Sequence, residues 1–223
     1  MLLRFSLATG VSAQIPEGFT PLFNGRDLTG WHISRTTHHG TTPDVRVEDG
    51  AIVLRQHPYG QGGLLMTDET YGDFELYLEV KPDWGTNGGI LFRSTEGGSG
   101  YQVEMVGGGA PGTGNLFGEM LRVSKGAEAT ALQQVWKEND WNAFRLRVVG
   151  EVPHATLWVN GVQMWDVTLE RNDLIADATE GRIALQLHWS ATYTPISDAF
   201  PMHLSWKPGA AHRYRNIAIK ELE

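Results

Sequence analysis

Hydrogen-bonding and titratable side chains recur at alternate positions in three separate stretches of this chain. The first stretch carries Arg93, the second Gln102 and Glu104, and the third Gln186 and His188. Because alternate residues of a β-strand point to the same face, each stretch would present these groups on one side of a sheet. A guanidinium, two amides, a carboxylate and an imidazole can hydrogen-bond a polar ligand and exchange a proton with it. We therefore expect the three stretches to converge on one concave, polar surface.

The same alternation also fits the solvated face of an ordinary antiparallel sheet, which is apolar inside and polar outside. In that interpretation Arg93 and Glu104 form an ion pair on the sheet surface, and His188 is a hydrogen-bonded structural histidine. The pattern of residues by itself leaves both interpretations open.

Strands separated by tight turns would have to position these groups. Residues 87–106 are predicted to form two strands joined by a turn rich in glycine and serine, and residues 73–81 and 181–189 alternate in the same way. Asp49-Gly50 and Asn160-Gly161 mark hairpin turns between alternating runs. Almost no helical period is present, so we predict an all-β jelly-roll sandwich of two antiparallel sheets. Residues 107–139 are less regular and are predicted to form a loop beside the cleft.

Composition excludes some classes of partner. Lys and Arg number 18 against 26 Asp and Glu, giving a formal net charge of −8, and no basic cluster is present, so we predict no binding to nucleic acid. No stretch has the roughly 18 apolar residues that a membrane span requires, so no span is predicted. Cysteine is absent, which excludes disulfides, thiolate metal sites and a cysteine nucleophile. The oligomeric state is left open.

The first 18 residues differ from the rest of the 223-residue chain. They contain one basic residue, a short apolar run and the small residues Val11-Ser12-Ala13, so they resemble the remnant of a secretory signal. A disordered N-terminal arm is the alternative. Residues 19–223 are predicted to be a single domain, and the signal-like start predicts a periplasmic or secreted bacterial protein.

The adjacent pair His38-His39 precedes Asp44 and invites comparison with a zinc site. Adjacent histidines lack the i, i+4 spacing that strong sites use, so we expect both to be solvated loop residues. No cofactor is predicted. A divalent cation held by backbone carbonyls would leave no trace in the sequence, so that possibility stays open.

The order of short motifs along the chain resembles one known family. The motifs are Leu22-Phe23-Asn24-Gly25-Arg26-Asp27-Leu28-Thr29-Gly30-Trp31, Val47-Glu48-Asp49-Gly50, Asp73-Phe74-Glu75-Leu76, Asn87-Gly88-Gly89-Ile90, Phe92-Arg93, Gly100-Tyr101, Trp141-Asn142, Asn160-Gly161, Leu185-Gln186 with His188, and Tyr214-Arg215-Asn216-Ile217 continuing to Leu222. From Phe19 to the end this series resembles the 3-keto-disaccharide hydrolase family, a former domain of unknown function. The resemblance implies a concanavalin A-like jelly-roll fold.

The resemblance also implies a carbohydrate partner, a glycoside already oxidised to a ketone at C3. A C3 ketone makes the C2 proton acidic, so the glycosidic bond can break by elimination between C1 and C2, followed by hydration. Such chemistry needs a base, an acid for the leaving group and donors for an enolate oxygen. We predict Glu104 or His188 as the base. The other predicted site residues are Arg93 and Gln186 as donors to the enolate and hydroxyls, and Gln102, Asn87, Arg215 and Trp206 as substrate-binding groups.

Two features depart from the family pattern. Gln102 and Glu104 stand where the family usually has Glu and Gln, and the acidic residue that usually follows is missing. Residues 190–211 are an insertion that is predicted to form a lid or a substrate platform. Either departure would alter substrate preference or catalysis.

Two other functions compete with the elimination chemistry. A conventional retaining glycosidase needs two carboxylates about 5–5.5 Å apart, and Glu104 has no acidic neighbour on its face. A non-catalytic carbohydrate-binding module needs no base and could stack sugars on its aromatic side chains. The aromatic candidates are Tyr59, Trp84, Phe117, Trp158, Trp165 and Trp206.

Overall fold

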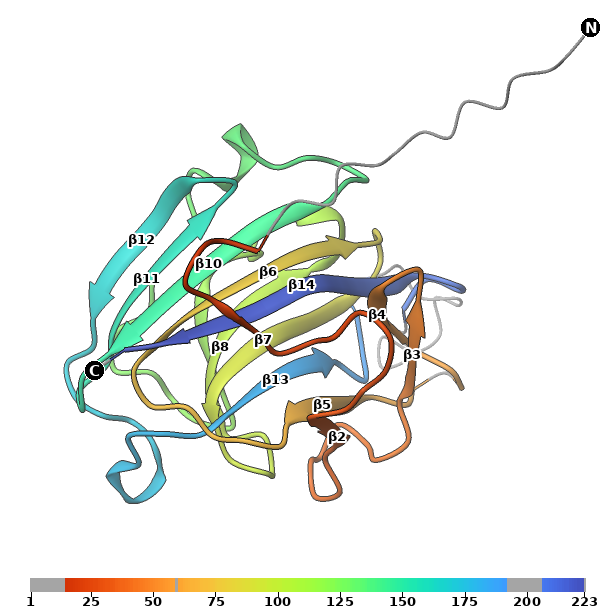
Figure 1. Ribbon diagram of the computed structural model, residues 1–223. Coiled ribbons are helices and arrows are strands. Elements are labelled where there is room, and N and C mark those ends of the chain that lie inside the picture. The colour runs from red at the N-terminus through yellow and green to blue at the C-terminus, as the bar shows by residue number, and fades with distance from the viewer. Residues whose placement is uncertain (1–14, 59, 192–205, 223) are drawn as a thin grey trace, which may run out of the picture.

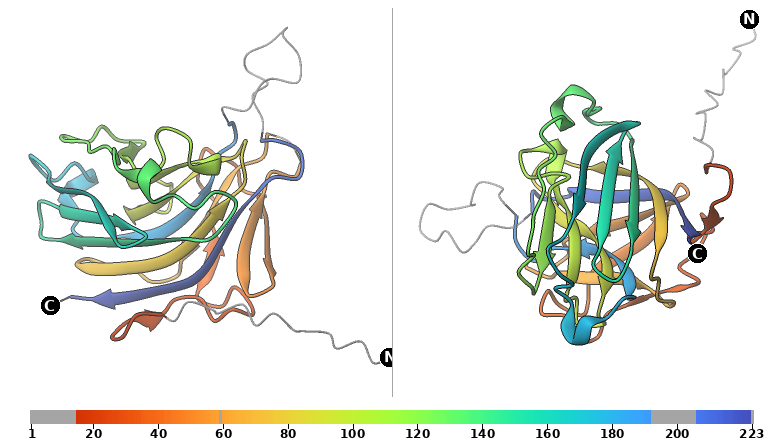
Figure 2. Two further views of the ribbon diagram at one scale, coloured as in Figure 1. Left: turned by 90° about the horizontal axis from the view of Figure 1, so that it is seen from above. Right: turned by 90° about the vertical axis from the view of Figure 1, so that its left-hand side faces the viewer.

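Two antiparallel β-sheets stacked face to face make up the fold in a computed structural model that describes residues 15–58, 60–191 and 206–222 (Figures 1 and 2). The prediction of an all-β sandwich of two antiparallel sheets is confirmed. Within the described residues, helical structure consists of three 3₁₀ turns, η1 (Gly107–Gly109), η2 (Leu132–Gln134) and η3 (Ile175–Asp177). None of these turns approaches the length of a membrane-spanning helix.

The first sheet has eight strands and occupies the front of Figure 1. Strand β1 pairs with β14, and the other seven follow one another in hydrogen-bonded order. In that order the strands are β12 (Val162–Thr168), β11 (His154–Val159), β10 (Asn142–Val149), β6 (Phe74–Pro82), β14 (Ala211–Glu221), β4 (Ala51–Arg55) and β3 (Asp44–Glu48), with β1 (Thr20–Pro21) beside β14.

The second sheet has six strands and lies behind the first in Figure 1. All three polar stretches singled out in the sequence belong to it, in strands β7, β8 and β13. In hydrogen-bonded order the strands are β2 (Trp31–Ile33), β5 (Gly63–Thr67), β13 (Arg182–Leu187), β7 (Asn87–Ser94), β8 (Gly100–Val106) and β9 (Leu116–Glu119).

Both predicted hairpin turns are present. Asp49 and Gly50 join β3 to β4 with φ angles of 51° and 75°, and Asn160 and Gly161 join β11 to β12 with φ angles of 50° and 83°. Two successive residues with positive φ form the turn whose twist matches a two-residue hairpin, and Asn, Asp and Gly tolerate that backbone best. These dipeptides therefore set the register of the hairpins.

Alternate apolar side chains of the two sheets fill the space between them. Phe74, Leu76 and Leu78 of β6 face the core from the first sheet, and Val103 and Leu185 face it from the second. All five are at most 1% exposed. Since the alternate residues of the same strands point outward, the outer face of the six-stranded sheet carries the polar stretches.

The irregular segment 107–139 contains a strand that the sequence did not indicate. Strand β9 forms the edge of the six-stranded sheet and pairs with β8, placing Phe117 opposite Gln102 and Glu119 opposite Gly100. It adds one acidic and one aromatic side chain to the outer face.

Candidate functional site

The outer face of the six-stranded sheet brings polar groups from neighbouring strands together. Gly89 on the central strand β7 pairs with Gln186 on one side and Glu104 on the other, and Leu91 pairs with Gln102. Directly paired residues in antiparallel strands project from the same face. Two of the three predicted stretches therefore converge as expected.

The glycines of the Asn87-Gly88-Gly89 motif create the space for this convergence. A side chain at Gly89 would collide with Gln102, whose Nε2 lies 1.9 Å from an ideal Cβ position. Without that side chain, Gln102 lies across β7, donating from Nε2 to the carbonyl of Gly88 at 3.2 Å and to Oε1 of Gln186 at 3.0 Å. Gln102 and Gln186 are 3% and 1% exposed, so this amide pair is a buried, specific contact.

Gln186 extends the network to two residues that the sequence analysis did not place in the site. Its Nε2 lies 3.0 Å from Oε2 of Glu119 and 3.0 Å from Nε2 of His39. Burial opposes ionisation of Glu119, but the hydrogen bond and charge of His39 and the bond from Gln186 outweigh it and lower the pKa of this carboxyl. Glu119 is therefore a carboxylate at neutral pH.

The expectation that His38 and His39 are both solvated is wrong for His39, which is 2% exposed. Their loop folds over the outer face because Ser34 accepts from the backbone N–H of Thr37 at 3.2 Å and Thr37 accepts from that of His39 at 3.3 Å. These side-chain turns bend the loop inward. His38 stays at the surface, with its ring centroid 3.9 Å from that of His39.

A small apolar cluster also lies on the outer face of this sheet. The cluster consists of outer-face residues that are fully buried, namely Leu64, Met66, Leu91 and Ala184. Leu64 of this cluster lies near the loop, since an ideal Cβ at Gly98 would lie 2.6 Å from its Cδ1 and 3.4 Å from Oγ1 of Thr37.

His188 follows β13 and lies beside the network. Its ring centroid is 5.0 Å from that of His39, and its Nδ1 contacts the backbone of Ser190. Burial lowers the pKa of His188, so the imidazole is neutral at pH 7 and can accept a proton. Asn87 lies next to it, with its backbone carbonyl accepting from the His188 N–H at 3.1 Å.

Glu104 is half-buried on the same face, and none of the described residues forms an ion pair with it. Burial alone raises the pKa of its carboxyl, which makes its conjugate base stronger than an ordinary glutamate. Gly112 borders this carboxylate, since an ideal Cβ there would lie 3.3 Å from Oε2 of Glu104. A base of raised pKa on a ligand-facing surface is typical of a catalytic group.

Arg93 does not join the polar face, contrary to the prediction. It has a φ of 48°, beside a register shift in the β7–β13 pairing, and this bulge turns its side chain away from the outer face. The guanidinium is buried and donates to the carbonyls of Gly72 and Gly150 at 3.1 and 2.9 Å and to Asp73 at 2.8 Å. Arg93 therefore ties the six-stranded sheet to the first sheet.

Arg215 and Trp206 also lie elsewhere. Arg215 donates to Glu79 at 2.6 Å and covers the ring of Trp141 at 4.1 Å, on the outer face of the eight-stranded sheet. Trp206 is 1% exposed, and its Nε1 donates to the carbonyl of His188 at 3.0 Å. It supports the backbone of His188 and offers no surface to a sugar. Most of the inserted segment 190–211, predicted to be a lid or platform, lies outside the described residues.

The aromatic candidates divide by exposure. Phe117 and Trp84 are 52% and 56% exposed, whereas Trp165 is buried and Trp158 lies under Arg145. Tyr59 lies outside the described residues. Phe117 pairs with Gln102, so its ring flanks the polar network and can stack on a sugar there.

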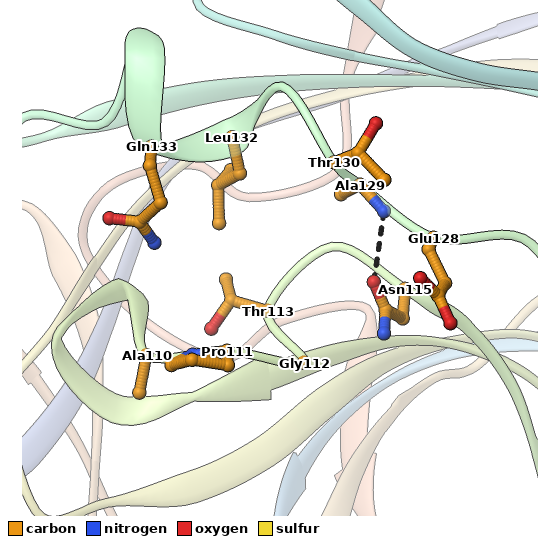
Figure 3. Close-up of a pocket in the computed structure, with 10 residues that line it drawn as sticks. All are labelled: Ala110, Pro111, Gly112, Thr113, Asn115, Glu128, Ala129, Thr130, Leu132 and Gln133. Atoms are coloured by element: carbon orange, nitrogen blue, oxygen red, sulfur yellow. Dashed lines mark hydrogen bonds between the residues drawn. The ribbon is translucent and has the colours of Figure 1, made fainter.

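A separate hollow of about 310 Å³ lies between the 110–115 loop and residues 128–133 (Figure 3). Asn115 accepts a hydrogen bond from the backbone N–H of Ala129 across it at 2.9 Å. Glu128 is its one titratable lining residue, and none of His39, Glu119 and Gln186 lines it. The hollow lacks the chemistry of the outer face, so we do not assign the site to it.

Comparison with known proteins places the chain in a family. Residues 18–220 match the sequence model of the 3-keto-alpha-glucoside-1,2-lyase-like domain. No curated protein matches the chain.

Solved structures share the fold at low sequence identity. A putative glycosyl hydrolase from Parabacteroides distasonis superposes with a TM-score of 0.61 at 20% identity, covering 93% of this chain and 95% of that one. The Bacillus licheniformis beta-glucanase gives 0.58 at 13% identity, with 92% and 99% covered. The carbohydrate-binding module CBM66 from Bacillus subtilis gives 0.54 at 13% identity, with 86% and 96% covered. The jelly-roll fold is thus shared by enzymes and by binding modules.

Proposed function

Because this chain belongs to the 3-keto-alpha-glucoside-1,2-lyase-like family, we propose that it cleaves glycosides that carry a ketone at C3, by elimination between C1 and C2 followed by hydration. The observation that carries the proposal is Glu104, a half-buried carboxylate of raised pKa on the same sheet face as the Gln102–Gln186 network. The proposed site is the outer face of the six-stranded sheet.

One group of suitable strength can act as both the base and the acid of the elimination. Glu104 takes the proton from C2, which the neighbouring ketone makes acidic, and the electron pair forms an enolate. The enolate then expels the glycosidic oxygen from C1, and the proton on Glu104 passes to that oxygen. Water adds to the resulting enone, with its oxygen at C1 and its hydrogen at C2, and the products are a 3-keto sugar and an alcohol.

His188 is the second candidate base, since its neutral imidazole can accept a proton. Glu104 is the better candidate because burial raises the pKa of its carboxyl and so strengthens it as a base, whereas burial lowers the pKa of His188 and weakens its imidazole as a base. The exposed ring of Phe117 supports a sugar at this face.

Release of the 3-keto monosaccharide from a 3-keto-disaccharide, such as 3-ketotrehalose, tests the proposal, with the unoxidised disaccharide as the comparison substrate. We expect release from the ketone alone and a loss of about 10²–10⁴-fold in turnover for Glu104→Gln. Glu128→Gln, an exposed glutamate beside the separate hollow, is the matched control and should keep full activity. Full activity in Glu104→Gln with loss in His188→Gln would transfer the base role to His188.

Binding of both disaccharides without any release would contradict the enzymatic proposal. The exposed Phe117 beside a hydrogen-bonding network would then support a carbohydrate-binding module. Replacing Phe117 by Ala should weaken sugar binding in either case.

A further inference from the structure

Three side-chain atoms that can bind a metal converge at the edge of the polar network. Nε2 of His39 lies 3.3 Å from Oε1 of Glu119, and Nε2 of His38 lies 3.5 Å from the same oxygen. All three ligand atoms lie within 4.8 Å of one another. The two histidines come from the loop that covers the outer face, and Glu119 comes from the edge strand β9.

The orientation of the amides near this cluster follows from a backbone carbonyl. The oxygen of Gly88 can only accept, so the atom of Gln102 that contacts it at 3.2 Å is the amide nitrogen. That nitrogen also donates to Oε1 of Gln186, so the Nε2 of Gln186 must face Glu119 and His39. The donors and acceptors around His39 are therefore fixed.

The position of His39 brings its Nε2 against two polar groups of the network. His39 is 2% exposed, and its Nε2 lies 3.0 Å from Nε2 of Gln186 and 3.3 Å from Oε1 of Glu119. The Nε2 of His38 lies 3.5 Å from the same carboxylate oxygen. Two imidazole nitrogens and a carboxylate oxygen held this close together are a preformed set of metal ligands.

A cation placed between the three atoms would be coordinated by all of them. Zinc bound by imidazole nitrogen and carboxylate oxygen at about 2.1 Å in tetrahedral geometry separates its ligands by about 3.4 Å, close to the two spacings seen here. Gln186 keeps its bond to Oε2 of Glu119, the oxygen that the ion does not use, and so orients the carboxylate. The ion would neutralise the charge of Glu119.

We infer that His38, His39 and Glu119 bind one divalent metal ion of the zinc type through both Nε2 atoms and Oε1. Two imidazoles and one carboxylate form the ligand set of catalytic zinc sites, in which a fourth position stays open. The side chain of His38 is 42% exposed, so the open position faces solvent on the outer face.

The inference assigns a task to the ion that rests on the proposed function. An enolate oxygen needs a positive group or a donor, yet Gln102 donates to Gly88 and Gln186, and Gln186 is held by Glu119 and His39. The amide of Gln186, which is predicted to serve the enolate, is thus already engaged, and so is the neighbouring amide of Gln102. A Lewis acid with an open position would bind the C3 ketone oxygen and stabilise the enolate.

Metal binding itself is the test, measured without substrate. Chelator-treated protein is titrated with Zn²⁺ and, for comparison, Ca²⁺ and Mg²⁺, and bound metal is quantified after dialysis. We expect one Zn²⁺ per chain and a higher midpoint of thermal unfolding when Zn²⁺ is present. Oxygen-seeking Ca²⁺ and Mg²⁺ should bind far more weakly, because two of the three ligands are imidazoles.

The variants separate a metal site from an ordinary ion pair. His38→Ala, at an exposed side chain that the fold does not need, and Glu119→Gln should each lower Zn²⁺ affinity at least about 100-fold. Gln186→Leu should lower it about 10–100-fold, as expected for an outer-shell partner. His32→Gln is the matched control. Asp68 and Glu96 contact opposite nitrogens of the His32 ring, so the three side chains cannot bind one metal ion together. This variant should still bind one Zn²⁺ per chain. Absence of stoichiometric Zn²⁺ uptake, or uptake unchanged in His38→Ala, would overturn the inference.

The outcomes also distinguish this inference from the proposed function. Zn²⁺ uptake without release from 3-keto-disaccharides would leave the metal site standing and remove the proposed function. Release that persists after complete removal of metal would keep the function and refute the task given to the ion.

Discussion

Replacing Gly89 by Ala is the sharpest test of how the site is built. The three nearest atoms to an ideal Cβ at this position all belong to Gln102, with Nε2, Cδ and Cγ at 1.9, 2.4 and 2.5 Å. The φ angle of Gly89 is not in the left-handed region, so the added methyl strains no backbone. The whole cost of the substitution therefore arises from displacing Gln102.

The expected loss of stability follows from the bonds that Gln102 must give up. Its amide serves the carbonyl of Gly88 and Oε1 of Gln186, both in a region closed to solvent. Leaving a buried acceptor without its donor costs about 1–3 kcal/mol, so Gly89→Ala should lose about 3 kcal/mol. For a domain of this size that loss lowers the unfolding midpoint by about 6–12 °C.

Urea denaturation of a double-mutant cycle measures this coupling. In a Gln102→Ala background the three colliding atoms are gone, so Gly89→Ala should then cost less than about 1 kcal/mol. Gly72→Ala is the control, because its nearest neighbour lies 3.6 Å from an ideal Cβ, an ordinary contact. An equal loss in both backgrounds would refute the view that Gly89 exists to accommodate Gln102.

Two further predictions concern stability, and a third concerns ligand binding. Arg93→Lys should lower the free energy of unfolding in urea by about 2–4 kcal/mol, because one ammonium cannot donate to Asp73 and to two carbonyls at once. The KM for sugar should stay unchanged. A changed KM with unchanged stability would show that Arg93 belongs to the site. Burial lowers the pKa of His212 from 6.5 to about 3, so the unfolded chain takes up a proton that the folded one excludes. The free energy of unfolding should therefore fall by about 5 kcal/mol as the pH drops from 6.5 toward 3. In His212→Gln the fall over the same pH range should be smaller by that amount. Phe117→Ala should leave the unfolding midpoint within about 2 °C, because the ring is exposed, yet weaken sugar binding measured by calorimetry.

Local signals were sufficient for both predicted hairpin turns and for the strands that carry the polar stretches, although not for β9. Asp49-Gly50 and Asn160-Gly161 specify their hairpins through a backbone conformation that few other residues adopt, whatever surrounds them. The period of two also placed Gln102 with Glu104 on one face of their strand, because alternation is a property of any extended chain, and the pairing of β8 and β13 with β7 then brought Gln186 to the same face.

Alternation failed at Arg93 because one bulge interrupts it. The register shift beside Arg182 and the positive φ of Arg93 turn its side chain toward the other sheet. Arg215 was misplaced because motif order along a chain does not say which sheet a strand joins, and Trp206 was misplaced because the sequence does not show that its ring is buried. The pairing of β14 with β6 and β4 decides that Arg215 lies on the first sheet.

The sequence by itself determined the fold class, the two tight hairpins and the polar face of each strand, such as that shared by Gln102 and Glu104, because each depends on residues adjacent or alternate in the chain. Only the tertiary structure decided that His39 and Glu119 meet at Gln186. His39 lies on a loop, and Glu119 lies on an edge strand within an irregular segment. No alternation of residues in the sequence predicts that such elements come together. Their contact depends on the fold of the 34–39 loop over the sheet and on the pairing of β9 with β8, which brings Glu119 to the edge of the same face.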